Sequence, residues 1–158
     1  RAFYPKGCGT PIQQQLFGFA DASEYAICYV IYMRTQTTNG QIHVANVAGA
    51  TRVLAKGTTF KGVLSIPRAE LCAADELVKR VLQVENDLKI DNLKSTQYFS
   101  DSKDVLDWIK NKTTPQYKYV ANRINRICNL TTDAQWHYVP TNVNPADIGT
   151  RPDRKSVV

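Results

Sequence analysis

The chain lacks an apolar stretch long enough to cross a lipid bilayer, and it is poor in the residues that build zinc sites. Its longest apolar run, Ala26–Met33, falls well short of the ~18–20 residues that a membrane helix needs. Its 4 cysteines form no C-x-x-C pair, and zinc modules need closely spaced ligands. No basic segment with an apolar core follows Arg1, so we expect no secretory signal and an intracellular protein with reduced thiols.

The composition indicates one globular domain. The chain has 158 residues, of which 43% are hydrophobic and 22% charged, and a chain of this size can bury one core. Lys and Arg number 20 against 14 Asp and Glu, a net charge of +6, and basic proteins attract polyanions by counterion release. Nucleic acid is therefore a candidate partner. We expect a linker over residues 1–15, the domain over 16–151 and a tail over 152–158.

The apolar pattern predicts an α/β fold with a mixed sheet. Strands are predicted at residues 16–22, 25–33, 41–47, 97–100 and 135–139. The Asn39-Gly40 pair favours a tight hairpin, so the first three strands should form an antiparallel meander. Helices are predicted from Ser65-Ile66-Pro67 onward, over 103–111 with Ser102 as the cap, and over 117–130. Residues 51–62 read as a loop and 140–152 as irregular.

Four acidic residues stand where a core-forming chain does not need them. They are Asp21 within an apolar strand, Glu70 in the first turn of a helix, Asp101 at a strand end and Asp147 after the last strand. Taken alone, Glu70 could simply favour its helix N-terminus, and Asp101 or Asp147 could be ordinary turn residues. Asp21 is harder to explain, because a carboxylate in a buried strand must be paired or metal-bound to stay charged.

Taken together, the acids predict a metal site. Parallel neighbouring strands that carry Asp21 and Asp101 would place both carboxylates at one edge of the sheet, where α/β proteins bind ligands. Mg²⁺ prefers carboxylate oxygens and keeps several waters. Two such ions about 3.5–4 Å apart can activate water and stabilise the departing oxygen of a phosphodiester. We therefore expect hydrolysis of a nucleic-acid strand with two Mg²⁺ ions, for which Mn²⁺ can substitute.

The segments around the four acids resemble the ordered Asp, Glu, Asp, Asp motifs of ribonuclease H. They are Phe19-Ala20-Asp21-Ala22-Ser23, Ile66-Pro67-Arg68-Ala69-Glu70-Leu71, Phe99-Ser100-Asp101-Ser102 and Asn144-Pro145-Ala146-Asp147. The resemblance runs from about Leu16 to Arg151. Ser65–Leu71, Val120–Ile124 and Asn144–Arg151 are also similar to the version found in BEL/Pao-type LTR retrotransposons.

The resemblance implies a ribonuclease-H-like fold, with a five-stranded mixed sheet of three antiparallel and two parallel strands flanked by helices. It implies an endonuclease that hydrolyses the RNA strand of RNA–DNA hybrids during reverse transcription and leaves 5′-phosphates. Asp21 would bridge both metals, Glu70 and Asp101 would flank them, and Asp147 would hold the metal that serves the water. The expected partners are the hybrid and the reverse transcriptase domain of the same polyprotein, in the cytoplasm or a virus-like particle. Substrate contacts are expected from Ser23, Arg68, Ser102 and Asn142.

Two features depart from the family pattern. Val139-Pro140-Thr141-Asn142 places Asn142 where many ribonucleases H have a mobile histidine, and Gly149 and Pro152 prevent a long helix after Asp147. The main alternative is a catalytically inactive ribonuclease-H-like scaffold or hybrid-binding module, although a scaffold has no reason to keep mutually repelling carboxylates. An integrase or transposase fits less well, because its two Asp are followed by a Glu on a late helix.

Overall fold

One five-stranded sheet organises the residues that the computed structural model describes, which are 4–7, 9–54, 65–91, 93–112 and 118–151. The strands are β1 (Pro11–Ala22), β2 (Ala26–Thr37), β3 (Ile42–Val53), β4 (Leu93–Ser100) and β5 (Trp136–Tyr138). The helices are α1 (Ile66–Leu88), α2 (Lys103–Asn111) and α3 (Lys118–Leu130). Three short 3-10 turns are η1 (Asp133–Gln135), η2 (Thr141–Val143) and η3 (Pro145–Thr150).

The strand order is β3-β2-β1-β4-β5. Strands β1, β2 and β3 pair antiparallel, whereas β4 pairs parallel with both β1 and β5. The turn between β2 and β3 contains Asn39-Gly40, and Gly40 has a φ of 74°, a conformation that glycine adopts without strain. The predicted mixed sheet, with its antiparallel meander and two parallel strands, is confirmed.

Several strand boundaries differ from the prediction. Pro11–Gln15, expected to be linker, form the first part of β1 and pair with β2, and β3 continues to Val53, so Thr51–Val53 of the expected loop are strand. These ends are partly or fully exposed, so main-chain pairing holds them and side-chain hydrophobicity gives no signal there. The rest of that loop, from residue 55 on, and the expected start of the last helix at 117 lie outside the described residues.

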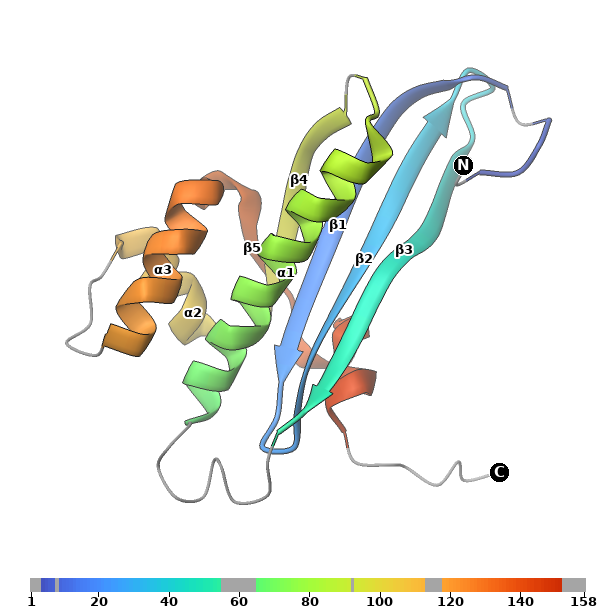
Figure 1. The fold of residues 1–158 in the computed structure, drawn as a ribbon. Coiled ribbons are helices and arrows are strands. Elements are labelled where there is room, and N and C mark those ends of the chain that lie inside the picture. Colours follow the sequence, from blue (N-terminus) through green and yellow to red (C-terminus); the bar gives the residue numbers. More distant parts are fainter. Residues whose placement is uncertain (1–3, 8, 55–64, 92, 113–117, 152–158) are drawn as a thin grey trace, which may run out of the picture.

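Helix α1 covers one face of the sheet (Figure 1), where it packs on β1 and β2. Its side chains Leu71, Leu77 and Val81 are fully buried, as the three- and four-residue spacing predicts. Gly18 allows the close approach, because a Cβ there would lie 2.8 Å from the Leu77 Cδ1 atom. Helix α3 packs on α1, and α2 lies against β4 and β5. No helix of the described residues is long and apolar enough to span a membrane.

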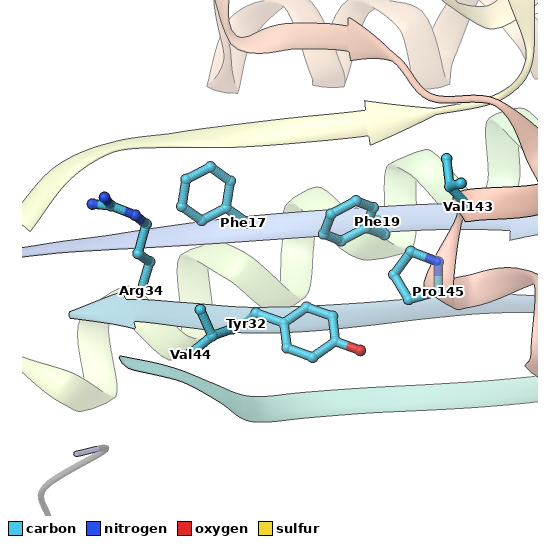
Figure 2. Close-up of a pocket in the computed structure, with 7 residues that line it drawn as sticks. All are labelled: Phe17, Phe19, Tyr32, Arg34, Val44, Val143 and Pro145. Atoms are coloured by element: carbon cyan, nitrogen blue, oxygen red, sulfur yellow. The ribbon is translucent and has the colours of Figure 1, made fainter. Parts of the chain in front are cut away.

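The opposite face of the sheet carries aromatic side chains. Figure 2 shows the rings of Phe17, Phe19 and Tyr32 on this face, with α1 behind the strands. At one end, Val143 and Pro145 line the same hollow. Both belong to residues 139–151, the C-terminal segment, which follows β5. The turn η3 packs on β2 and β1, and Gly149 makes this possible, because a Cβ at that position would overlap side-chain atoms of β2 and β3. The C-terminal segment is thus held against the sheet near the end of β1.

Candidate active site

Three of the four predicted acids meet at the carboxyl ends of two neighbouring strands. Asp21 lies near the end of β1 and Asp101 directly follows β4. These strands are parallel, with Ala20 paired to Ser100, so both acids leave the sheet side by side. Glu70 reaches the same place from α1, and one oxygen of each of the three carboxylates lies within 4.8 Å of the other two. The expectation that Asp21 and Asp101 share one edge of the sheet is confirmed.

The sequence predicts Glu70 in the first turn of its helix, but the structure places it beyond that turn. Helix α1 begins at Ile66, one residue before Pro67, and the Ser65 hydroxyl caps it by accepting from the Arg68 N–H at 3.4 Å. This start places Glu70 just beyond the first turn, which contains no acidic residue. Stabilisation of the helix N-terminus therefore does not account for this carboxylate, because that effect fades beyond the first turn.

Hydroxyl groups of the C-terminal segment hold two of the carboxylates. The Thr150 hydroxyl donates to Asp21 Oδ2 at 2.7 Å, and the Thr141 hydroxyl donates to Asp101 Oδ2 at 2.8 Å. The other oxygen of Asp101, Oδ1, is buried without a hydrogen-bond partner among the described residues. A buried polar atom without a partner is costly, so this oxygen is suited to a ligand that the protein itself does not supply.

The cluster is electrostatically frustrated without a counter-charge. Burial raises the pKa of Asp21 to about 6; the Thr150 hydrogen bond opposes this and the Asp101 charge adds to it. Burial also raises the pKa of Glu70 to about 7, against a hydrogen bond from Ser102 and with the charges of Asp101 and Asp21. Both shifts mean that the protein disfavours three negative charges in this space. A bound cation would reverse the imbalance.

The donors fit a hard divalent cation. All three side chains of the cluster offer carboxylate oxygens, which Mg²⁺ and similar ions prefer over nitrogen or sulfur. The Oδ1 atom of Asp101, which has no hydrogen-bond partner among the described residues, can accept such an ion. The residues present are therefore compatible with the divalent-metal chemistry predicted from the sequence.

Asp147 stands apart from this cluster. It lies in η3, and its Oδ2 forms an ion pair with Arg151 at 2.5 Å. Its main-chain carbonyl oxygen accepts from the Thr150 hydroxyl at 3.0 Å, the same hydroxyl that donates to Asp21. Asp147 is thus connected to the cluster through Thr150, while its own carboxylate is paired elsewhere. Its role as a metal ligand stays a prediction.

The four predicted substrate contacts have different local roles. The Ser23 hydroxyl donates to the Thr150 carbonyl oxygen at 2.5 Å, so it holds the C-terminal segment. Ser102 caps α2 as predicted, accepting from the main chain. Asn142 is exposed in η2, and Arg68 is half-buried at the start of α1. The part of these four residues in substrate binding stays a prediction.

Sequence reasoning missed three polar side chains that build the site. Two of them are Thr141 and Thr150, described above. The third is Asn144, which is buried, donates from Nδ2 to the Ala20 carbonyl oxygen and accepts from the Ala146 N–H, both at 3.1 Å. An Asn followed by Pro is a common turn and cap signal. Asn144 and Pro145 belong to the motif that contains Asp147, so this signal could have predicted Asn144 as a capping residue.

The fold and the acidic cluster define a ribonuclease-H-like domain. The chain is similar to the N-terminal ribonuclease H domain of Rv2228c from Mycobacterium tuberculosis, with TM-score 0.56, 12% identity and coverage of 86% of this chain and 90% of that one. It is also similar to ribonuclease H1 from Halobacterium salinarum, with TM-score 0.50, 14% identity and coverage of 86% of this chain and 92% of that one. A third similar structure is LC11 ribonuclease H1 in complex with an RNA/DNA hybrid, with TM-score 0.52, 11% identity and coverage of 86% of this chain and 92% of that one. At these identities the likeness establishes the fold.

The family is established by sequence. The family model for the Pao retrotransposon-like RNaseH-like domain matches residues 9–102, more than half of the chain. The chain therefore belongs to this family, and the resemblance to the BEL/Pao version of ribonuclease H is confirmed. No curated protein matches the chain.

Proposed function

We propose that this domain is a metal-dependent endonuclease that hydrolyses the RNA strand of RNA–DNA hybrids and leaves 5′-phosphate and 3′-hydroxyl ends. The observation that carries the proposal is the convergence of Asp21, Glu70 and Asp101 within 4.8 Å at the ends of two parallel strands. Two divalent cations held by these carboxylates would supply an activated water and charge stabilisation for in-line displacement. Mg²⁺ is the expected ion and Mn²⁺ its substitute.

Each acid has a distinct part in this proposal. Asp21, the most buried of the three with 5% exposure, would bridge both metal positions, and Glu70 and Asp101 would each hold one side. Asp147, whose Oδ2 is paired with Arg151, would hold the position that serves the water. The raised pKa values of Asp21 and Glu70 also weigh against an inactive scaffold, because a scaffold gains nothing from burying carboxylates that repel one another.

The substrate proposal rests on the family and on charge. The net charge of +6 favours a polyanion, and dispersed groups such as Arg68 would contact phosphates. Discrimination of RNA from DNA would come from contacts of Glu70, or of the main chain near Ser23, with the 2′-hydroxyl, the group that distinguishes the two locally. We place this activity in reverse transcription of a retroelement, beside the polymerase domain of the same polyprotein, in the cytoplasm or a virus-like particle.

The test compares four substrates: an RNA–DNA hybrid, duplex DNA, duplex RNA and single-stranded RNA, each end-labelled and incubated with Mg²⁺, with Mn²⁺ or with EDTA. We expect cleavage of the RNA strand of the hybrid alone, with either metal and not in EDTA. Asp21→Asn should abolish cleavage. The charge-matched control is Asp91→Asn, because Asp91 is exposed and lies beside the start of β1, at the opposite end of the sheet. Cleavage in EDTA, or by the Asp21→Asn variant, would contradict the proposal.

A further inference from the structure

Thr150 joins the acidic cluster to the C-terminal segment. It is the last residue of η3 and only 2% exposed. Its hydroxyl lies 2.7 Å from Asp21 Oδ2 and 3.0 Å from the Asp147 carbonyl oxygen. A hydroxyl has one proton, and hydrogen bonds to ionised acceptors are shorter and stronger than those to neutral ones. The shorter distance thus identifies Asp21 as the principal acceptor.

Two hydrogen bonds tie the main chain around Thr150 to the end of β1. The Thr150 carbonyl oxygen accepts from the Ser23 hydroxyl, just after β1 ends, and the Asn144 side chain donates to Ala20 within that strand. Gly149 lets the segment lie directly on β2 and β3. The position of the Thr150 hydroxyl is therefore set by the packing of η3 on the sheet. The orientation of the Asp21 carboxylate, which accepts from this hydroxyl, depends on the same packing.

A hydrogen bond to one oxygen orients the whole carboxylate. Because the two oxygens of Asp21 are fixed relative to each other, holding Oδ2 restricts rotation of the whole group. Metal-binding carboxylates are commonly oriented by such outer hydrogen bonds, and removal of the partner lowers metal affinity by about 10–100-fold. The buried Thr150 hydroxyl has the geometry that this role requires.

We propose that Thr150 is a positioning residue whose hydroxyl holds the Asp21 carboxylate ready for a divalent metal, and that it thereby couples metal affinity to the docking of the C-terminal segment. The inference rests on the proposed function in that it takes Asp21 as a metal ligand. It goes beyond it in assigning to the C-terminal segment a role in metal binding that does not depend on Asp147.

Metal binding, measured by calorimetric titration of Mn²⁺ into the metal-free full chain at neutral pH, tests this without reference to turnover. Thr150→Ser and Thr150→Ala form a matched pair, because both lack the methyl group and differ only in the hydroxyl. We expect Thr150→Ala to bind Mn²⁺ about 10–100-fold more weakly than wild type, and Thr150→Ser to stay within about threefold of wild type. Thr150→Val, which keeps the volume of threonine, should resemble alanine.

Thr131→Val is the control for the loss of a buried hydroxyl elsewhere. Thr131 is buried at the end of α3, donates to the Ile127 carbonyl oxygen and accepts from Trp136 Nε1. Its variant should lose thermal stability and keep its affinity for Mn²⁺. A purely structural role for Thr150 would make Thr150→Ala and Thr150→Val resemble this control, with lower thermal stability and unchanged affinity for Mn²⁺.

Equal Mn²⁺ affinity of the serine and alanine variants would overturn the positioning role. Failure of both the alanine and the valine variants to fold, with Thr131→Val folded, would also overturn it, because Thr150 would then serve folding. The proposed function fails separately: if wild type binds Mn²⁺ and does not cut hybrid, the enzyme assignment falls while the difference between serine and alanine still tests Thr150.

Discussion

The three clustered acids and Asp147 are held in the molecule by different means. Asp21, Glu70 and Asp101 sit on or directly beside β1, α1 and β4, whose main-chain hydrogen bonds and core packing fix them. Asp147 sits in a 3-10 turn, and an ion pair with Arg151 already satisfies one of its oxygens. The first three carboxylates already lie together, whereas Asp147 lies outside their cluster with one oxygen paired to Arg151.

This difference suggests a division of labour. Preformed carboxylates can hold a cation in the absence of substrate, because their positions do not depend on it. A carboxylate on a short irregular segment can change its contacts at lower cost, because fewer main-chain hydrogen bonds restrain it. We therefore expect variants of the cluster to act on metal binding and turnover together, and variants of the C-terminal segment to act in a graded way.

The largest effect is expected from Asp101→Asn. The amide can still accept from the Thr141 hydroxyl, so the fold should persist, but the negative charge is lost. We expect cleavage of the hybrid to fall by at least about 1000-fold, because metal-derived charge stabilisation contributes several kcal/mol. Single-turnover rates measure this, with the exposed Asp107→Asn of α2 as the control. Turnover near the wild-type rate would show that the cluster is not the active site.

A smaller loss is expected from Asp147→Asn, about 10–100-fold in rate at fixed Mg²⁺, as for a supporting ligand. Arg151→Gln should change the rate by less than about threefold, because a partly exposed ion pair contributes little. Rates measured over a range of Mg²⁺ concentrations separate weaker metal binding from slower turnover. A loss as complete as that of Asp101→Asn would break the distinction between the two groups, and no loss at all would remove Asp147 from the site.

The same contrast marks what the sequence could predict. The acids on regular elements were found because apolar periodicity locates β1, α1 and β4, and parallel neighbours then bring Asp21 and Asp101 to one edge. The prediction that Glu70 lies in the first turn of α1 was wrong. The signal Ser65-Ile66-Pro67 fits a helix that starts at either Ile66 or Pro67, and the earlier start moves Glu70 just beyond the first turn. Contacts of Thr150 and Thr141 with the carboxylates could not be predicted. They join residues far apart in the chain through 3-10 turns that have no periodic signature.

A third prediction concerns stability and pH, and it probes the frustration of the cluster. The pKa of Asp21 rises from an ordinary 3.8 to about 6, and that of Glu70 from 4.5 to about 7. A raised pKa in the folded state means that folding favours the protonated acid. The contribution of these groups to stability is complete below pH ~4. It is lost as the pH rises through about 6 and 7.

In EDTA, the wild-type melting temperature should therefore fall relative to Asp21→Asn and Glu70→Gln between pH 5 and pH 7.5, by a few degrees. Thermal unfolding monitored by circular dichroism measures the difference, with Asp91→Asn as control. Addition of Mg²⁺ at pH 7.5 should raise the melting temperature of wild type more than that of either variant, because a bound ligand stabilises the fold by mass action. A wild type that gains stability over both variants with rising pH would show that the cluster is not frustrated.

The smallest effect is expected from Asn142→His, which sharpens the role of the C-terminal segment. Asn142 is exposed in η2, next to Thr141, which holds Asp101, so a larger side chain fits without repacking. Histidine titrates near neutral pH and asparagine does not. We expect a change in turnover of about two- to tenfold that depends on pH between 6 and 8, with the same cleavage position, because a titrating group affects proton transfer or product release without moving the cluster.

The pH–rate profile of the Asn142→His variant measures this change. The control is Asn142→Gln, which is similar in polarity to wild type, cannot titrate in this range and should keep the wild-type profile. Complete loss of cleavage in both variants would instead assign to Asn142 an essential contact with the substrate.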